Sequence, residues 1–282
     1  LGDEALKNNW QFYPPKTLTG KKIMIVGAGP SGLSAAYHLR KLGHEVTIFE
    51  AGPVAGGMMN FGIPAYRMPR NILQAEIKRI ENFGVKIVLN YKVKDILKEK
   101  ENGGFDAVFV AIGAHLAKKV NIPAQEASKI LDAVSFLKDA DENSDNKPLL
   151  GRRVAIYGGG NTAMDAARTA KRLGADEAMI IYRRDREHMP AHEFEADEAL
   201  SEGVKIHWLS TIKNMETSSI TVEKMQVVDG KAVPTGEYET LEADSLILAL
   251  GQEADTDFLK HIEGITFKED GTTVEVNPAM MT

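Results

Sequence analysis

The chain has 282 residues, with 34 Lys and Arg against 40 Asp and Glu, and a net charge of −6 at pH 7. This acidic balance argues against a nucleic-acid partner or an anionic membrane surface. No apolar run approaches the ~18 residues of a membrane-spanning helix, so no membrane insertion is expected. The absence of cysteine excludes disulfides, cysteine-ligated iron–sulfur clusters and a redox-active CxxC pair within the chain. The polar N-terminus is not a signal peptide, and a cytoplasmic location is the default expectation.

Residues 1–20 precede the first regular pattern. They are polar and contain Pro14-Pro15, which predicts an N-terminal arm with little regular structure. A disordered leader and an ordered clasp both fit this composition.

Residues 22–50 form the strongest single pattern. A strand-like run at 23–26 leads into Gly27-Ala28-Gly29-Pro30-Ser31-Gly32, then a helix-like stretch at 33–42 and a second strand that ends on Glu50. In a dinucleotide-binding unit the first glycine makes the turn, the second admits a pyrophosphate, and the third lets helix and strand pack closely. Glu50 suits the acid that holds a ribose hydroxyl. The alternative is a glycine-rich turn that binds nothing.

Between this unit and residue 150 the sequence predicts alternating helices and strands. Gly56-Gly57 indicates a turn or a close approach of backbone to a ligand. A helix is predicted from Pro69 to Phe83, followed by a strand at 85–89. A buried strand is predicted at 105–112, closed by Gly113, and a short helix at 130–137. The polar run 139–147 is predicted to be a surface linker.

The opening pattern then returns. A strand at 154–157 leads into Gly158-Gly159-Gly160-Asn161-Thr162-Ala163, a helix at 164–173 and a strand at 178–182. This strand ends on Arg183-Arg184, which we match to the position of Glu50 in the first unit. An arginine pairs bidentately with phosphate, so the second unit is predicted to take a 2′-phosphorylated ribose. The alternative is a solvated basic edge.

Residues 189–201 are predicted to form a helix opened by Pro190. His188 and His192, with acidic neighbours, lack a third ligand at a telling spacing. A solvated helix face is therefore the favoured interpretation, and no metal site is predicted.

The last predicted elements are strands. They lie at 204–208 and within 219–249, with turns at 229–230 and 235–236, and a buried strand at 243–250 ends on Gly251. An Ala-x-Gly pair thus closes each unit, as Ala111 with Gly113 and as Ala249 with Gly251. The repetition supports a duplicated dinucleotide-binding domain.

Longer stretches carry a family resemblance: GAGPSGL (27–33), FEAGPVAGGMM (49–59), GIPAYRMP (62–69), AIGAH (111–115), GGGNTAMDAARTAKRLGA (158–175), YRRDREHMPA (182–191) and ALGQ (249–252). From about residue 20 to 282 the chain resembles the flavin (small or β) subunit of glutamate synthase. It is also similar to the matching domains of dihydropyrimidine dehydrogenase and NADH-dependent ferredoxin:NADP oxidoreductase.

The resemblance implies an α/β fold like that of glutathione reductase, with two Rossmann-like dinucleotide-binding domains. The NAD(P)H domain is expected to be inserted in the FAD domain. The expected divisions are the arm at 1–20, the FAD domain at 21–150, the NAD(P)H domain at 151–250, and a return to the FAD domain at 251–282. This return is expected to be truncated before a Gly-Asp segment that the family places next.

The resemblance also implies which residues bind FAD and NADPH or NADH. Gly57, Met58 and Arg67 would lie beside the flavin, and Val93 near the adenine. The full set of expected cofactor-binding residues is Gly27, Gly29, Pro30, Ser31, Gly32, Glu50, Gly57, Met58, Arg67, Val93, Ala111, Gly113, Gly159, Gly160, Asn161, Thr162, Arg183, Arg184, Ala249 and Gly251.

The implied function is hydride transfer from NADPH or NADH to FAD, followed by electron transfer to an iron–sulfur protein or subunit of a larger complex. The cofactor would carry the chemistry, so no catalytic residue is predicted. Three alternatives stay open. They are a flavoenzyme that reduces an organic substrate directly, a non-catalytic assembly subunit that keeps the fold, and use of NADH rather than NADPH.

Overall fold

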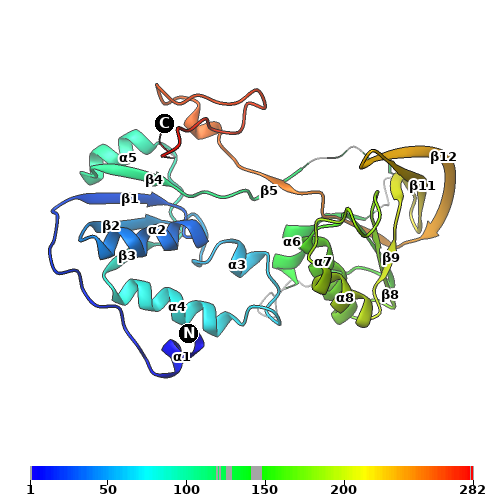
Figure 1. The fold of residues 1–282 in the computed structure, drawn as a ribbon, viewed down its shortest axis with the longest axis horizontal. Coiled ribbons are helices and arrows are strands. Elements are labelled where there is room, and N and C mark those ends of the chain that lie inside the picture. Colours follow the sequence, from blue (N-terminus) through cyan, green and yellow to red (C-terminus); the bar gives the residue numbers. More distant parts are fainter. Residues whose placement is uncertain are drawn as a thin grey trace. The chain divides into compact units, whose positions relative to one another are not determined.

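The computed structural model describes residues 2–118, 120, 122–124, 129–140, 148–279 and 281. The chain divides into two compact units (Figure 1). The first comprises Leu1–Phe61, Ala65–Leu116 and Glu253–Thr282, and the second comprises Gly62–Pro64 and Ala117–Gln252. The second unit is therefore an insertion in the first. Apart from the short Gly62–Pro64 segment, the chain passes into the second unit within β5 (Leu116–Ala117) and back within β14 (Gln252–Glu253), two short strands that pair with each other.

The first unit is built on a parallel sheet of four strands in the order β3-β2-β1-β4. These strands are β1 (Lys22–Val26), β2 (Glu45–Phe49), β3 (Val85–Val88) and β4 (Ala107–Val110). Helix α2 (Pro30–Lys41) links β1 to β2, and the short α3 (Met58–Phe61) and α4 (Arg70–Asn82) lie between β2 and β3. Pro30 begins α2, where its missing N–H would have no helical partner in any case.

Different elements cover the two faces of this sheet. Apolar side chains of α2 and α4 pack on the face that includes Ile25 and Ile48. Met24 and Val26 point to the opposite face, toward α5 (Ile96–Gly103) and the 3-10 turn η1 (Asp257–Leu259). Neighbouring residues of one strand alternate between faces, so the predicted strand at 23–26 is buried on both sides, as parallel sheets are.

The N-terminal arm is an ordered clasp on the first unit. It begins with α1 (Gly2–Lys7). The ring of Phe12 lies 4.7 Å from that of Tyr37 and 5.4 Å from that of Phe83, measured between centroids. The Arg79 guanidinium lies 4.5 Å over Phe12, and Arg79 Nε donates to the Trp10 carbonyl at 2.9 Å. Of the two alternatives for residues 1–20, the structure favours the ordered one.

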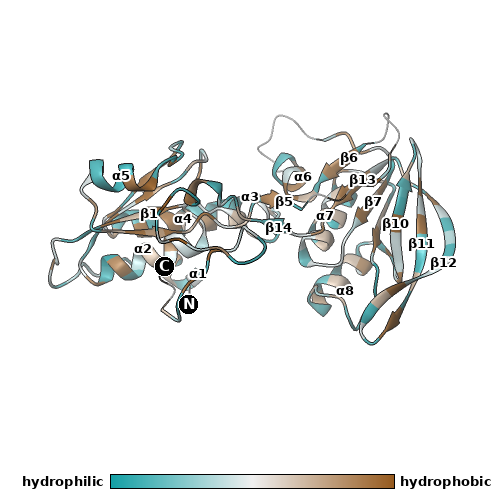
Figure 2. Ribbon diagram, turned by 90° about the horizontal axis from the view of Figure 1, so that it is seen from above, coloured by the Kyte–Doolittle hydropathy of each residue, from teal (hydrophilic) through white to brown (hydrophobic). Residues whose placement is uncertain are grey.

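The second unit contains a five-stranded parallel sheet in the order β6-β13-β7-β8-β9. Its strands are β6 (Ile130–Asp132), β7 (Arg153–Tyr157), β8 (Glu177–Ile181), β9 (Lys205–His207) and β13 (Ser245–Leu248). In Figure 2 the strands β7 and β13 are coloured mostly as hydrophobic, in keeping with a sheet buried on both faces.

Helices cover one face of this sheet and a second sheet covers the other. The core between this sheet and the helices contains Phe136 of α6 (Ala133–Asp139), Met164 of α7 (Asn161–Arg172) and Ala196 of α8 (Glu193–Ser201). The second core is filled from an antiparallel sheet. Its strands are β10 (Ser210–Met215), β11 (Ser219–Val228) and β12 (Lys231–Glu242).

The structure divides the chain at 117 rather than at the expected residue 150. The reason is that β6 pairs in parallel with β13 of the second unit. The predicted helix at 130–137 accordingly splits into β6 and α6, and the Asp132 carboxylate caps α6 by accepting from Ser135 N at 2.8 Å. Most of the predicted linker at 139–147, namely residues 141–147, lies outside the described residues.

The strand predicted to be buried at 105–112 is partly exposed. It is observed as β4, in which Phe109 and Val110 are 39% and 40% exposed. Within the described sheet β4 is an edge strand that pairs only with β1. Its counterpart β13 lies between β6 and β7 and is buried. Strand neighbours, which no local pattern encodes, decide this difference.

Two further predictions about local structure are wrong. Residues 189–192 are not helical, because α8 begins at Glu193 after His192 as its N-cap. The predicted turn at 235–236 is instead part of the continuous β12, where it forms an irregularity: Glu223 pairs with Tyr238 and Met225 with Pro234, so the extra residues lie on β12. The predicted turn at 229–230 is confirmed.

Candidate dinucleotide-binding sites

The first glycine turn connects β1 to α2. Gly27 has φ 105°, and a Cβ there would lie 2.3 Å from the Ala111 carbonyl oxygen. A Cβ on Gly32 would lie 1.9 Å from the Gly27 oxygen. Beside Gly29, in contrast, the nearest atom to an added Cβ is the Gly57 Cα at 4.0 Å. Gly27 and Gly32 therefore serve chain packing, whereas Gly29 leaves space beside the N-terminus of α2.

The second glycine turn connects β7 to α7 and repeats this geometry. Gly158 has φ 148°, and its Cβ would lie 2.3 Å from the Ala249 carbonyl oxygen. Nothing lies within 4 Å of a Cβ added to Gly160. Ala163 occupies the position of Gly32 and is fully buried. The two Ala-x-Gly pairs thus have a structural reason, since each alanine carbonyl packs against the first glycine of its own turn.

Glu50 holds the first turn directly. Its carboxylate accepts from the backbone N–H of Ala28 at 2.8 Å and from that of Gly52 at 2.7 Å. Both donors belong to loops at the carboxyl edge of the sheet, where cofactors of open α/β folds bind. A carboxylate fixed at this edge suits the hydroxyl groups of a ribose.

The strand register corrects the match that we made between Arg183 and Glu50. Gly27 N donates to the Phe49 oxygen, and Gly158 N donates to the Ile181 oxygen. The residue after Phe49 is Glu50, whereas the residue after Ile181 is Tyr182. Tyr182 is therefore the counterpart of Glu50, and Arg183 follows one position later. The one-residue error arose because β8 ends at Ile181 rather than at Tyr182.

The two arginines stay predictions as phosphate ligands. Arg183 is exposed and Arg184 is partly buried. Arg184 Nε is a buried side-chain nitrogen without a hydrogen-bond partner among the described residues. A buried guanidinium nitrogen without a partner is costly. An oxyanion at this position would satisfy it.

The other expected residues of the second site surround its turn. Asn161 and Thr162 are the first residues of α7, and Asn161 Oδ1 accepts from His192 N at 3.0 Å. The Asn161 side chain therefore anchors the segment before α8. A Cβ on Gly159 would lie 2.4 Å from the Tyr182 ring, so Gly159 makes room for that ring. Gly251 is exposed, with φ 100°.

The remaining expected FAD residues have varied surroundings. Gly57 has φ 52°, and its Cβ would lie 2.8 Å from the Gly29 Cα, so the two loops pack backbone to backbone. Met58 begins α3, and Arg67 is partly buried. Val93 is 6% exposed within the core, which leaves only its backbone for a ligand. The roles of these residues at the flavin stay predictions. Pro30 and Ser31 form the first turn of α2, and Gly113 is exposed.

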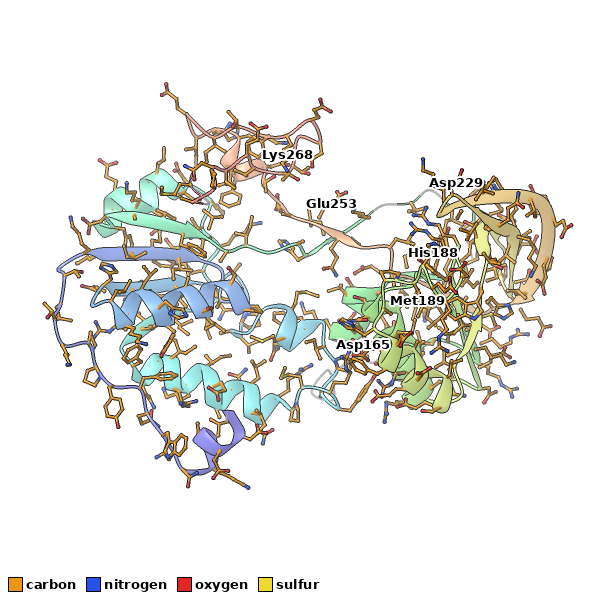
Figure 3. All side chains as sticks on the ribbon, in the orientation of Figure 1. Asp165, His188, Met189, Asp229, Glu253 and Lys268 are labelled. Atoms are coloured by element: carbon orange, nitrogen blue, oxygen red, sulfur yellow. The ribbon has the colours of Figure 1, made fainter. Side chains whose placement is uncertain are left out.

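The segment that follows β8 has a role that the sequence did not predict. In Figure 3 His188 and Met189 are labelled there. His188 Nδ1 lies 2.7 Å from Asp185 Oδ1, and this hydrogen bond lowers the pKa of Asp185 below its ordinary value. Ala191 N donates to the Gly159 oxygen at 3.0 Å. The segment therefore folds back onto the glycine turn, and no pattern in the sequence signals this.

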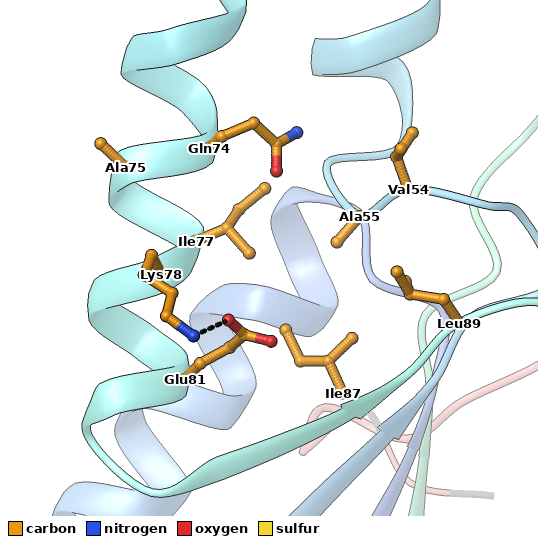
Figure 4. Close-up of a pocket in the computed structure, with 9 residues that line it drawn as sticks. All are labelled: Val54, Ala55, Gln74, Ala75, Ile77, Lys78, Glu81, Ile87 and Leu89. Carbon is orange, nitrogen blue, oxygen red and sulfur yellow. Dashed lines mark hydrogen bonds and ion pairs between the residues drawn. The ribbon is translucent and has the colours of Figure 1, made fainter.

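A pocket of about 520 Å³ lies on the first unit, beside α4 and the loops around β3 (Figure 4). Its one ion pair joins Lys78 Nζ to Glu81 Oε2 at 3.0 Å. None of the expected cofactor residues lines it. The lining residues are Val54, Ala55, Gln74, Ala75, Ile77, Lys78, Glu81, Ile87 and Leu89.

The described residues contain no cluster of three or more His, Cys, Asp or Glu side chains arranged for a metal ion. Among those same residues no helix is both long and apolar enough to cross a membrane.

The buried Arg168 meets three carboxylates, Glu195 at 3.7 Å and Glu198 and Glu202 at 2.7 Å. This cluster joins α7 to α8, and Arg168 lowers the pKa of Glu202.

In each glycine turn one glycine, Gly29 or Gly160, leaves open space at a helix N-terminus. The two turns define a protein with two dinucleotide sites in one chain. The sequence matches the pyridine nucleotide-disulphide oxidoreductase family over residues 21–282. The chain belongs to that family, and its cofactors are FAD and NADPH or NADH. The space beside Gly29 and Gly160 and the unpartnered Arg184 Nε fit these anionic cofactors.

Individual relatives agree with this class. The β subunit of the NADP(+)-dependent formate dehydrogenase of Moorella thermoacetica is 43% identical over 258 residues, 86% of this chain and 36% of that protein. The NAD-dependent dihydropyrimidine dehydrogenase subunit PreT of Escherichia coli is 35% identical over 262 residues, 93% of this chain and 61% of that protein. The chain thus spans less than two thirds of either relative. The predicted resemblance to the dihydropyrimidine dehydrogenase group is confirmed.

A solved structure confirms the predicted fold class. FprA of Mycobacterium tuberculosis in complex with NADPH superposes with a TM-score of 0.73 at 20% identity, covering 91% of this chain and 75% of FprA. At this identity the likeness concerns the fold alone. The chain lacks cysteine, so its own residues have no thiol for the disulfide chemistry in the family name.

Proposed function

We propose that this chain is the part of an oxidoreductase subunit that takes electrons from NADPH and passes them through FAD to an iron–sulfur partner. One observation carries the proposal: the chain contains two complete dinucleotide turns and no cysteine, hence two cofactor sites without a thiol relay. Bound FAD would supply the chemistry, because it accepts a hydride and releases electrons singly.

In this proposal the residues of the chain bind and orient the cofactors. Gly29 and the N-terminus of α2 receive the FAD pyrophosphate, and Glu50 receives the ribose. Gly160 and the N-terminus of α7 receive the pyrophosphate of NADPH. Arg183 and Arg184 bind its 2′-phosphate, since a guanidinium matches a phosphate bidentately.

The iron–sulfur partner and the larger complex also belong to the proposal. Both relatives are named as subunits, and the chain offers no cysteine to hold a cluster of its own. A role like that of the glutamate synthase small subunit is one specific form of this function. A cytoplasmic location, where NADPH is available as reductant, completes the proposal.

The test is anaerobic reduction of the purified protein. We expect a yellow protein whose flavin absorbance is bleached by NADPH in preference to NADH and recovers on addition of a ferredoxin. In Arg183→Ala plus Arg184→Ala, kcat/KM for NADPH should fall about tenfold to a hundredfold, the value of one bidentate contact, and that for NADH should change little. A wild-type preference for NADH, or equal losses for both nucleotides, would contradict the proposal.

A further inference from the structure

Tyr182 occupies the position at which the first unit carries its ribose-binding acid. Its backbone is fixed on both sides, because its N–H donates to the His207 oxygen and its oxygen accepts from Ser210 N, both at 3.0 Å. Glu50 N donates to Val88 in the matching way. At this position the second unit therefore presents a ring where the first presents a carboxylate.

The Tyr182 side chain is held as firmly as its backbone. It is 7% exposed and lies against Gly159, where a Cβ would come within 2.4 Å of the ring. The Trp208 ring packs edge-on against it at 6.4 Å between centroids. The Tyr182 hydroxyl donates to the His188 carbonyl at 2.7 Å. The ring thus connects the glycine turn to the middle of the next loop.

That loop, residues 183–192, carries Arg183, Arg184 and Arg186, and we call it the arginine loop. Its far end is attached to the glycine turn by Ala191 N with the Gly159 oxygen and by His192 N with Asn161 Oδ1. Between these ends the loop is held at three further points. The Tyr182 hydroxyl donates to the His188 oxygen, and Leu209 N donates to the Arg184 oxygen at 3.1 Å. Arg186 pairs with Asp197 of α8.

We propose that Tyr182 determines the nucleotide preference of the second unit, by removing the ribose-binding acid and by fastening the arginine loop to the glycine turn. The inference deepens the proposed function and rests on it. A carboxylate at this position accepts hydrogen bonds from the 2′- and 3′-hydroxyls of NADH and repels a 2′-phosphate. A buried tyrosine whose hydroxyl is already engaged does neither. The fastened loop keeps its arginines at the edge where the phosphate binds.

Calorimetric titration of the FAD-loaded protein with 2′,5′-ADP and 5′-AMP tests this, because the two fragments differ only in the 2′-phosphate. We expect wild type to bind 2′,5′-ADP more tightly. Tyr182→Phe removes one hydrogen bond and should weaken 2′,5′-ADP about three- to tenfold, with 5′-AMP within twofold. Tyr182→Glu should abolish or reverse the preference. Gly159→Ala, which displaces the ring, should act in the same direction as Tyr182→Phe.

Tyr157→Phe is the matched control. It removes a tyrosine hydroxyl in the same unit, one that shares a hydrogen bond with Thr211 at 2.5 Å, and both fragments should bind it as they bind wild type. The role of Tyr182 would be overturned if both Tyr182→Phe and Gly159→Ala bound 2′,5′-ADP as wild type does, or if they weakened the binding of both fragments equally. Either result would leave the proposed NADPH function standing. A wild-type protein that prefers 5′-AMP would overturn the proposed NADPH function together with the role of Tyr182.

Discussion

The two units share one construction and differ at the residue that follows the second strand of each glycine-turn motif. In each, a strand enters a glycine turn whose first glycine packs on an alanine carbonyl and whose second leaves open space. The residue after the second strand is Glu50 in one unit and Tyr182 in the other. Under the proposed function, packing of the glycine turn would fix the position of the pyrophosphate, and the single residue at the strand end would select the nucleotide.

The shared construction extends to the opposite edge of each sheet. In the first unit the Asp106 carboxylate accepts from Lys22 N at 2.8 Å and pairs with Lys21. In the second the Asp244 carboxylate accepts from the N–H groups of Arg152 and Arg153, both at 2.9 Å, and pairs with the Arg153 guanidinium at 2.7 Å. In both units an aspartate thus ties the last strand of the parallel sheet to the strand that enters the glycine turn, more elaborately in the second.

The largest effect is expected from a substitution that disrupts the first glycine turn. Gly27→Ala would place a Cβ against the Ala111 backbone at positive φ, and we expect a loss of about 2–5 kcal/mol in the free energy of unfolding. Gly104→Ala is the control, since Gly104 also has positive φ (62°) but nothing lies within 4 Å of its Cβ. That change should cost about 1 kcal/mol. Denaturant unfolding measures both, and equal losses would contradict the packing argument.

The second prediction separates the two cofactors. Gly160→Ala should leave the thermal midpoint nearly unchanged, because its Cβ meets no protein atom, yet weaken NADP+ about tenfold to a hundredfold through overpacking against the pyrophosphate. Gly29→Ala should weaken FAD in the same way and spare the nucleotide. Calorimetry and flavin content measure the two losses. If either variant weakens both cofactors alike, the assignment of one cofactor to each turn fails.

The third prediction concerns the aspartate ties. Asp244→Ala leaves two backbone N–H groups and Arg153 Nη2 without their acceptor, while Arg153 Nη1 keeps Glu242. The change should cost the second unit about 2 kcal/mol. Asp106→Ala should cost less, because its partner Lys21 is 61% exposed and exposed ion pairs contribute little. Thermal unfolding of both variants checks the ranking. A larger loss for Asp106→Ala would contradict it.

The smallest expected effect is a pH dependence of the same tie. Hydrogen bonds from Arg153 lower the pKa of Asp244 in the folded protein. A lowered folded-state pKa contributes stability that is present above the unfolded value of about 3.9 and is lost as pH falls through the folded value. The gap in thermal midpoint between wild type and Asp244→Asn should therefore hold from neutral pH and shrink below about pH 4. A gap that widens on acidification would refute this.

The sequence by itself determined both glycine turns, their helices α2 and α7, and the flanking strands. These features are local: a turn with positive φ needs glycine, and the helical and strand periods of apolar residues are visible in short windows. The repeated motif gave the two dinucleotide-binding units, and the family resemblance of the longer stretches gave the class of protein and its two kinds of cofactor. The fixed acid of the first unit, Glu50, followed as well.

Only the tertiary structure decided matters of register and neighbourhood. It assigned the position of Glu50 to Tyr182 because strand pairing, unlike residue counting, fixes which residue follows β8. It exposed β4 because no described strand covers its outer edge, and it buried β13 because β6 does. It also moved residues 189–192 from helix to loop, through hydrogen bonds to a glycine turn about thirty residues earlier. Such contacts join residues distant in sequence, and a local pattern contains no record of them.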